Sequence, residues 1–171
     1  MKKNYSLKIK NMINRKIILY SLVCLFVMGC SNDDDDSQDM EKPSIDMSGS
    51  NAFPQNCIVL YRGESFPFRA VFADNQELGN YNIEIHNNFD HHSHSTDDVE
   101  CDLESKKTPV KAFVYNQDFT IPSGKNTYQA NNEISIPSDV DTGDYHFMIR
   151  LTDKAGWQQL KAISLKIKDK N

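Results

Sequence analysis

The pattern of apolar and polar positions predicts short strands rather than helices from about residue 57 onward. Apolar and polar residues alternate with a period of two at 66–73, 81–86, 145–151 and 160–167, which is typical of strands with one buried face. The sequence has no long apolar repeat of 3.6 residues with helix caps. Short β-rich runs between turns predict further strands at 57–61, 112–115, 119–121 and 134–136.

About seven short strands separated by turn residues predict an all-β fold, an antiparallel β-sandwich. We expect residues from about 57 to 168 to form two packed antiparallel sheets with almost no helix. The side chains expected to face inward occupy alternate positions along their strands; they are Phe68, Phe72, Ile83, Ile85, Tyr145, Phe147, Ile149, Leu151 and Leu165.

One hairpin near the C-terminus resembles a known module. Gly143-Asp144-Tyr145, followed by the turn Asp153-Lys154-Ala155-Gly156, is similar to the penultimate strand of bacterial immunoglobulin-like and cadherin-like modules. There a Gly-x-Tyr opens the strand and an Asp-x-x-Gly turn leads into the last strand, which would here be about 158–168. The resemblance implies an immunoglobulin-like β-sandwich, and the turn residues by themselves also predict a paired hairpin.

Residues 1–29 are predicted to be a lipoprotein signal peptide. Six basic residues precede an apolar run of 12 residues at 17–28, too short to span a membrane, which takes about 20 residues. Val27-Met28-Gly29-Cys30 resembles the lipobox of lipoproteins, which implies that Cys30 carries the lipid. The alternative is a plain cleaved signal with Cys30 as an ordinary thiol, and Met12 instead of Met1 is a second candidate start.

An acidic run follows Cys30 and sets the expected location. Asp33–Asp36 belong to a segment, 30–42, that we expect to be a disordered tether, with the sandwich domain at 43–171. The run resembles the tether of lipoproteins anchored in the outer membrane and facing the cell exterior; a spacer on a periplasm-facing lipoprotein is the alternative. Residues 1–29 hold six of the 19 basic and none of the 24 acidic residues, so the rest has a formal charge of −11. This charge argues against nucleic-acid binding.

Two cysteines, Cys57 and Cys101, lie beyond the signal. In an oxidising compartment they are candidates for a disulfide. A separate role for each cysteine is equally compatible with the sequence. The more specific alternative is that Cys101 binds a metal as a thiolate.

Four of the five histidines fall within nine residues, at 86–94. His86, His91, His92 and His94, with Asp90 among them, form a candidate metal site because neutral imidazole is the commonest metal ligand. Three imidazoles with a carboxylate or water suit Zn²⁺, with Cu²⁺ as the alternative. Adjacent residues of an extended chain point to opposite sides, so we do not expect all four to bind at once. The other interpretation is a solvated loop, in which Phe89 still anchors the chain to the core.

His146, the fifth histidine, is an auxiliary candidate. In an immunoglobulin-like order, the strands around His86 and His146 are antiparallel neighbours, so the two histidines could be cross-strand partners. Met148 shares the outer face, and a His-x-Met pair suits copper. The simpler interpretation is an exposed strand histidine beside an exposed methionine.

The chain as a whole resembles a family of Bacteroidota lipoproteins catalogued as domain of unknown function 4625. The resemblance rests on the lipobox, the Gly63-Glu64 turn, the His-rich run from Ile85 to His94 and the Gly143/Gly156 hairpin. It covers nearly all of residues 43–168. It implies the fold and the location but no activity.

These observations favour a non-enzymatic, surface-exposed lipoprotein that binds a divalent transition metal. Capture or handover of the metal to an outer-membrane protein partner is one expected role, and structural pinning of the loop is another. An adhesion or assembly module that binds a protein or glycan is the alternative, and a small metallohydrolase is a weaker one. The sequence lacks the Gly-x-Ser-x-Gly, His-Glu-x-x-His and phosphate-loop signatures of common enzymes.

Overall fold

The computed structural model of the chain describes residues 38–94 and 101–170. The predicted signal at 1–29, the expected lipidation site Cys30 and the acidic run lie outside these residues. No helix that could cross a membrane is found among the residues described. The strands there are, in chain order, β1 (Ser44–Asp46), β2 (Ile58–Tyr61), β3 (Ser65–Ala73), β4 (Leu78–Asn87), β5 (Tyr115–Thr120), β6 (Thr127–Ser135), β7 (Gly143–Asp153) and β8 (Gln158–Lys168).

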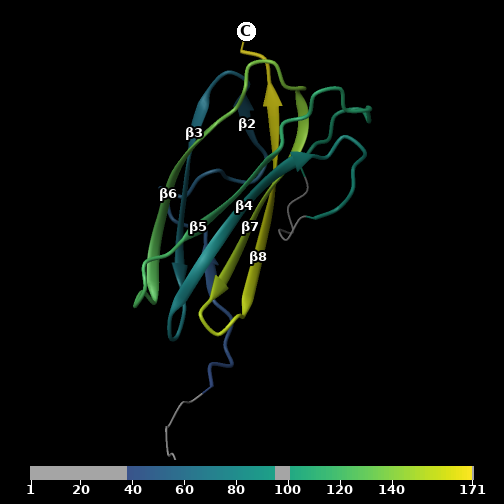
Figure 1. The fold of residues 1–171 in the computed structure, drawn as a ribbon. Coiled ribbons are helices and arrows are strands. Elements are labelled where there is room, and N and C mark those ends of the chain that lie inside the picture. The colour runs from purple at the N-terminus through teal and green to yellow at the C-terminus, as the bar shows by residue number, and fades with distance from the viewer. Residues whose placement is uncertain (1–37, 95–100, 171) are drawn as a thin grey trace, which may run out of the picture. The chain divides into compact units, whose positions relative to one another are not determined.

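The strands form two sheets that face each other (Figure 1). One has the order β1-β3-β6 and the other β2-β8-β7-β4-β5. All pairs are antiparallel except β2 with β8, which run parallel. The predicted all-β sandwich is therefore confirmed, with eight strands in the described ranges instead of about seven. The parallel β2–β8 pair departs from the purely antiparallel expectation.

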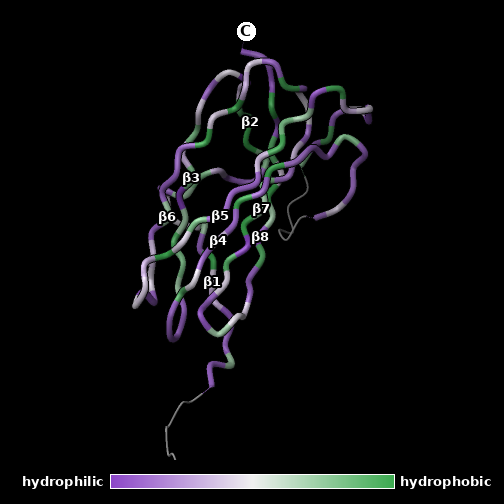
Figure 2. The backbone as a smooth tube through the Cα atoms, viewed as in Figure 1, coloured by the Kyte–Doolittle hydropathy of each residue, from purple (hydrophilic) through white to green (hydrophobic). Residues whose placement is uncertain are grey.

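The core lies between the two sheets. All nine side chains expected to face inward are buried, because alternate residues of a strand point to the same face. Aromatic rings join the sheets: the centroids of Phe68 and Phe147 lie 5.5 Å apart, and those of Phe72 and Tyr81 lie 5.0 Å apart. Hydrophobic and hydrophilic stretches interchange along the strands in Figure 2. Each large side chain buried here contributes about 1.5–3 kcal/mol.

Strands β4 and β7 run side by side through the middle of the larger sheet and define its two ends. Their register pairs Leu78 with Asp153 at one end and His86 with His146 at the other. At about 3.4 Å per residue, these ends are roughly 24 Å apart. Gly79 allows a close approach at the first end, since a Cβ there would lie 2.9 Å from the Asp153 carbonyl oxygen.

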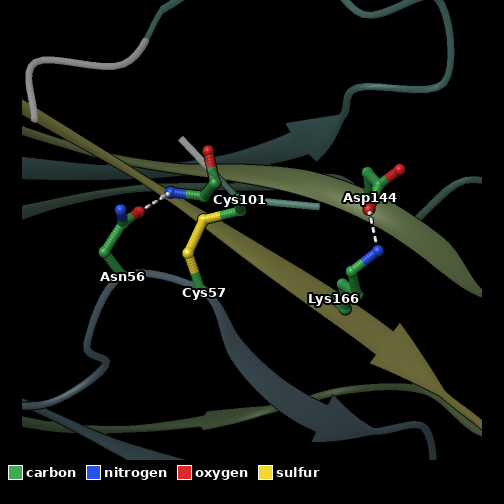
Figure 3. Close-up of a disulfide and its surroundings, with 6 residues drawn as sticks. Asn56, Cys57, Cys101, Asp144 and Lys166 are labelled. Carbon is green, nitrogen blue, oxygen red and sulfur yellow. Dashed lines mark hydrogen bonds and ion pairs between the residues drawn. A yellow bond between two sulfur atoms is a disulfide. The ribbon is translucent and has the colours of Figure 1, made fainter. Parts of the chain in front are cut away.

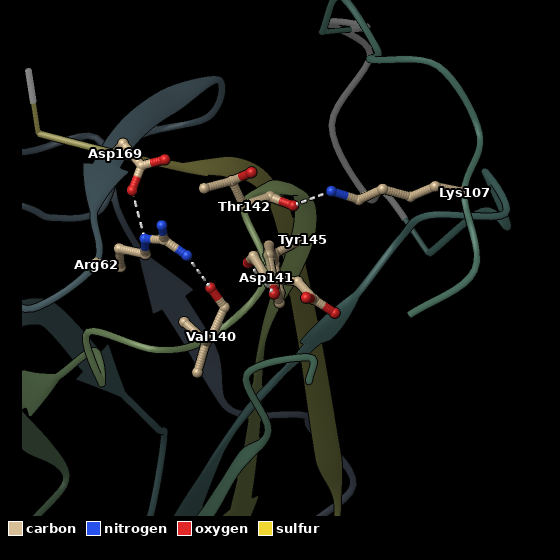
Figure 4. A network of polar contacts seen from close by, with 7 residues as sticks. All are labelled: Arg62, Lys107, Val140, Asp141, Thr142, Tyr145 and Asp169. Atoms are coloured by element: carbon tan, nitrogen blue, oxygen red, sulfur yellow. Dashed lines mark hydrogen bonds and ion pairs between the residues drawn. The ribbon is translucent and has the colours of Figure 1, made fainter. Parts of the chain in front are cut away.

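The segment between β4 and β5 is tied to the end that holds His86. The Tyr145 hydroxyl donates to the Asp141 carbonyl at 2.6 Å and accepts from the Phe113 amide at 3.2 Å, the arrangement of a tyrosine corner. In Figure 4 the Lys107 ammonium reaches the Thr142 carbonyl. The same view shows the Arg62 guanidinium donating to the Val140 carbonyl at 2.9 Å and pairing with Asp169. These contacts hold the strand that carries His146.

The domain begins before the boundary expected at residue 43. Asp39 is buried, and its carbonyl accepts a hydrogen bond of 2.8 Å from the indole nitrogen of Trp157. Its carboxylate accepts from the Asn75 side chain at 2.9 Å. Asp39, which was expected to lie in the tether, is therefore part of the packed domain, because its polar groups find partners between β3 and β4 and at the β7–β8 turn.

Candidate metal centre

The histidine-rich segment leaves the end of β4 and is anchored by Phe89. The Phe89 ring is buried and meets the Tyr145 ring edge-on, with centroids 5.3 Å apart. Gly143 makes room for it, because a Cβ at that position would lie 2.9 Å from the Phe89 ring. The Lys107 ammonium covers the ring at 4.5 Å, a cation–π contact. The expected anchoring role of Phe89 is confirmed, and it fixes the residues that follow.

Three histidines are brought together at this end of the sheet. The ring nitrogens of His86, His92 and His94 offer one candidate ligand atom each, all within 4.8 Å of one another. The Nε2 atoms of His86 and His92 are 3.3 Å apart. Two nitrogens bound to one tetrahedral Zn²⁺ at 2.0–2.1 Å would be separated by about 3.3–3.4 Å. The two imidazoles thus already have the spacing of ligands to a single ion.

A carboxylate faces the other nitrogen of two of these rings. The His92 Nδ1 lies 2.5 Å from Asp90 Oδ1. The His86 Nδ1 lies 3.0 Å from Glu84 Oε1, although the angle is not that of a regular hydrogen bond. A carboxylate that accepts Nδ1–H fixes the tautomer and directs the Nε2 lone pair outward, as behind metal-binding histidines. Asp90 therefore lies behind a candidate ligand, His92, and is not among the three residues whose candidate ligand atoms converge.

His146 is buried against the other three rings, only 2% exposed. It pairs across the strands with His86, which was one of the two interpretations of the sequence, and the other, an exposed strand histidine, is wrong. The segment that carries His92 folds over the outer face of β7, and the His146 Nε2 donates to the His92 carbonyl at 3.1 Å. Its Nδ1 is buried without a hydrogen-bond partner among the described residues. His146 thus positions His92 through its backbone.

The four rings surround a common point. The six distances between the ring centroids of His86, His92, His94 and His146 all fall between 4.9 and 5.6 Å. Nearly equal separations of all six pairs place the rings at the corners of a tetrahedron. The three imidazoles among them that offer a ligand atom, His86, His92 and His94, suit Zn²⁺, while Cu²⁺ also accepts imidazole.

His91 and Cys101 lie outside this arrangement. His91 has a φ of 62°, and its Nε2 donates to the Glu104 carbonyl at 2.8 Å, so its ring is directed away from the neighbouring His92. Cys101 forms a disulfide with Cys57 (Figure 3). Of the alternatives that the sequence left open, the disulfide is the one present, and a Cys101 thiolate ligand is wrong because the sulfur is already bonded.

A second set of contacts beside the disulfide fixes the same segment of the chain. Asp144 pairs with Lys166 at 2.9 Å (Figure 3) and accepts a hydrogen bond of 2.7 Å from the Glu104 amide. The chain just after Cys101 is thereby fixed to β7, next to His146. The disulfide and the buried Asp144 carboxylate together hold Glu104, whose carbonyl accepts the hydrogen bond from His91, in place.

Burial favours the neutral form of two of the histidines. Desolvation lowers the pKa of His86, with Glu84 opposing it, and lowers the pKa of His146, with the His92 carbonyl opposing it. The hydrogen bond from His92 lowers the pKa of Asp90. A neutral imidazole is the form that binds a metal, so this environment favours binding at neutral pH.

Sequence reasoning missed Glu84 and the positioning role of His146. Glu84 stands two residues before His86, so the period of two puts both on one face of β4. That signal was visible in the sequence. The burial of His146 under the loop was not visible in the sequence, because it depends on how the loop turns back at His91.

The comparisons with known proteins bear on family and fold. No curated protein matches the chain. Among solved structures, the chain is similar to a GspB Siglec domain, with 20% identity, a TM-score of 0.41, and coverage of 77% of this chain and 60% of that one. It is also similar to Spo0M, a sporulation control protein from Bacillus subtilis, with 12% identity, a TM-score of 0.40, and coverage of 75% and 49%. The chain thus spans less than two thirds of either structure.

The family assignment comes from the sequence. The profile of the family described as "Domain of unknown function (DUF4625)" matches residues 28–168. This range includes both strands that carry the histidine cluster and the loop between them. The chain therefore belongs to the DUF4625 family.

Proposed function

We propose that this protein binds one divalent transition metal ion, Zn²⁺ or Cu²⁺, through His86, His92 and His94. The observation that carries the proposal is the 3.3 Å separation of the His86 and His92 Nε2 atoms, each in a ring whose Nδ1 faces a carboxylate. With both Nδ1 atoms protonated toward carboxylates, two lone pairs face each other. A cation between them relieves that repulsion.

The degree of exposure supports an exchangeable ion. His86 and His92 are half-buried, whereas His94 is exposed. Three protein ligands leave one coordination position of a tetrahedral ion for water or for a donor from another molecule. Such a site suits capture of a metal and its handover, which is a binding function rather than catalysis. His146 contributes by holding the His92 backbone.

The location proposed for this function is the outer face of the outer membrane in a member of the Bacteroidota. Support comes from the lipobox-like Val27-Met28-Gly29-Cys30 and the acidic run after it. An outer-membrane protein would then receive the metal. A Cys30→Ser variant is expected to leave the membrane fraction or to remain unprocessed, as followed by fractionation and mass spectrometry. A Cys30→Ser protein that matures normally and stays in membranes would refute the anchor.

The metal proposal is tested by calorimetric titration of Zn²⁺ and of Cu²⁺ into the whole chain, purified without a histidine tag. We expect one ion per chain at pH about 7.5 and much weaker binding at pH about 5.5, because an imidazole binds a metal only in its unprotonated form. The His92→Ala, His94→Ala double variant is expected to lose the binding. The matched control is His91→Ala, which removes a neighbouring histidine outside the cluster and should bind as the parent does.

Two results would overturn the proposal. One is equal affinity in the parent and in the double variant. The other is parent binding no stronger than millimolar. Either would leave an adhesion or assembly module as the better hypothesis, with the loop contacting a protein or a glycan.

A further inference from the structure

Three aspartates meet at the end of the sandwich opposite the histidines. Asp39 precedes β1, Asp74 follows β3, and Asp153 ends β7. One carboxylate oxygen from each lies within 4.8 Å of the others. Asp39 and Asp153 are buried, 7% and 4% exposed, and Asp74 is half-buried.

Asp39 Oδ1 accepts from the Glu41 amide at 3.1 Å and from the Asn75 side chain at 2.9 Å, whereas Asp74 and Asp153 are each held through one oxygen. Asp153 Oδ1 accepts from the Trp157 amide at 2.8 Å, and Asp74 Oδ2 accepts from the Gln76 amide at 2.8 Å. The second oxygens, Asp153 Oδ2 and Asp74 Oδ1, are buried without a hydrogen-bond partner among the described residues. A side chain as buried as Asp153 with a free carboxylate oxygen calls for a cation or a proton.

Among residues 38–94 and 101–170, no basic side chain forms an ion pair with these carboxylates. Buried charges in proteins are paired or coordinate metals. The cluster has the negative charge of a cation site, and no basic side chain among the described residues balances that charge.

We infer that Asp39, Asp74 and Asp153 bind a calcium ion that fastens the N-terminal segment to the sandwich. Ca²⁺ takes oxygen ligands at 2.3–2.6 Å in flexible geometry, so two of its ligands can be up to about 5 Å apart. The three oxygens satisfy that limit. Mg²⁺ is smaller and demands a near-ideal octahedron, which suits three separate chain segments less well. Carboxylate donors also separate this site from the imidazole site, which prefers softer metals.

Trp157 is a built-in reporter of this site. It is the single tryptophan of the chain. Its amide binds Asp153, and its indole nitrogen donates to the Asp39 carbonyl at 2.8 Å. A cation that draws the aspartates together therefore changes the surroundings of the indole ring.

The experiment titrates Ca²⁺ into the whole chain while following Trp157 fluorescence and the melting temperature. We expect a saturable response with a Kd of about 10⁻⁴–10⁻³ M, the range of extracellular calcium modules, and a melting temperature that rises with free Ca²⁺. Asp74→Asn and Asp153→Asn should each weaken the response at least about tenfold. Asp118→Asn, an exposed aspartate on β5, and the His92→Ala, His94→Ala variant should respond as the parent does.

Proteolysis gives a second measurement that does not depend on the aspartate variants. Glu41 is exposed beside Asp39, and a Glu-specific protease should cut after it more slowly when Ca²⁺ is present. The inference is overturned by a parent without a saturable Ca²⁺ response, by aspartate variants that respond like the parent, or by a response to Mg²⁺ alone. None of these results bears on the histidine site, because the two donor sets share no residue.

Discussion

The two ends of the β4–β7 pair carry two groups of potential ligands built in opposite ways. At one end, His86, His92 and His94 come from a single stretch of nine residues and remain partly open to solvent. At the other end, Asp39, Asp74 and Asp153 come from three distant parts of the chain and are mostly buried. Strand β7 contributes to both ends, through His146 at the first and Asp153 at the second, yet only the histidine group is visible as a cluster in the sequence.

The difference extends to the groups behind the ligands. Carboxylates orient the imidazoles of His86 and His92, whereas backbone amides orient the carboxylates of Asp74 and Asp153. An imidazole has a second nitrogen that must be held in one tautomer, and a carboxylate has no such requirement. The imidazole end is thus suited to a soft, exchangeable metal, and the carboxylate end to a hard ion that joins chain segments.

Removal of the disulfide should have the largest effect and should separate the two ends. Cys57 and Cys101 close a loop with a sequence separation of 44. Chain-entropy arguments assign about 4 kcal/mol to a loop of that length. In urea unfolding, the Cys57→Ala, Cys101→Ala variant should lose about that much stability. The remaining folded protein should bind Zn²⁺ more weakly and respond to Ca²⁺ as before, because Cys57 lies beside Ser164 at the level of His146. An equal loss of both metal responses would contradict the separation.

Neutralising the carboxylates behind the histidines should have the next largest effect. Glu84→Gln and Asp90→Asn each weaken the hold on one Nδ1–H, and outer groups of this kind typically contribute 10–100-fold to metal affinity. Calorimetry should therefore show Zn²⁺ affinity reduced by about that factor, with little change in the melting temperature of the metal-free protein. Asp118→Asn is the control. Unchanged affinity in both variants would mean that the carboxylates do not act through the imidazoles.

A pH dependence of stability should be the smallest effect and should belong to the histidine end. Burial lowers the pKa of His86 and His146 in the folded protein. As pH falls below about 6.5, the unfolded chain takes up protons that the folded chain does not, so the free energy of unfolding decreases. The decrease levels off once the folded histidines are also protonated.

Urea unfolding in a metal chelator at several pH values between about 5 and 8 measures this effect, in a range that spans the histidine pKa. The His146→Gln variant should show a flatter pH dependence than the parent. His91→Gln, which replaces a histidine outside the cluster, should keep the parental slope. Identical slopes in all three proteins would place the pH dependence elsewhere in the molecule.

Strands with clear alternation were predicted well from the sequence, and strands without it were not. The alternations around Phe68, Ile83 and Phe147 gave β3, β4 and β7 with the correct inward faces. Strand β6 was expected only near Ile134, because residues 127–133 are mostly polar on a strand with few buried positions. β1 is only three residues long and forms by pairing with β3, which no local pattern reveals.

The candidate sites show the same division. An immunoglobulin-like strand order made His86 and His146 possible cross-strand partners, and their register pairs them. The burial of His146 and the direction of the His91 ring away from the cluster depend on how the loop turns back at His91, which has a positive φ. The aspartate cluster has no local signal, because its members are 35 and 79 residues apart along the chain, at 39, 74 and 153.

The sequence by itself determined the strand periodicity, the inward-facing core and the presence of an imidazole cluster at 86–94, because each depends on residues close together in the chain. It left the pairing of Cys57 with Cys101 open. Only the tertiary structure decided which histidines converge, that Cys101 is not a thiolate, and that Asp39 returns to meet Asp74 and Asp153. Those outcomes depend on strand register and loop path, which set distances between residues far apart in sequence.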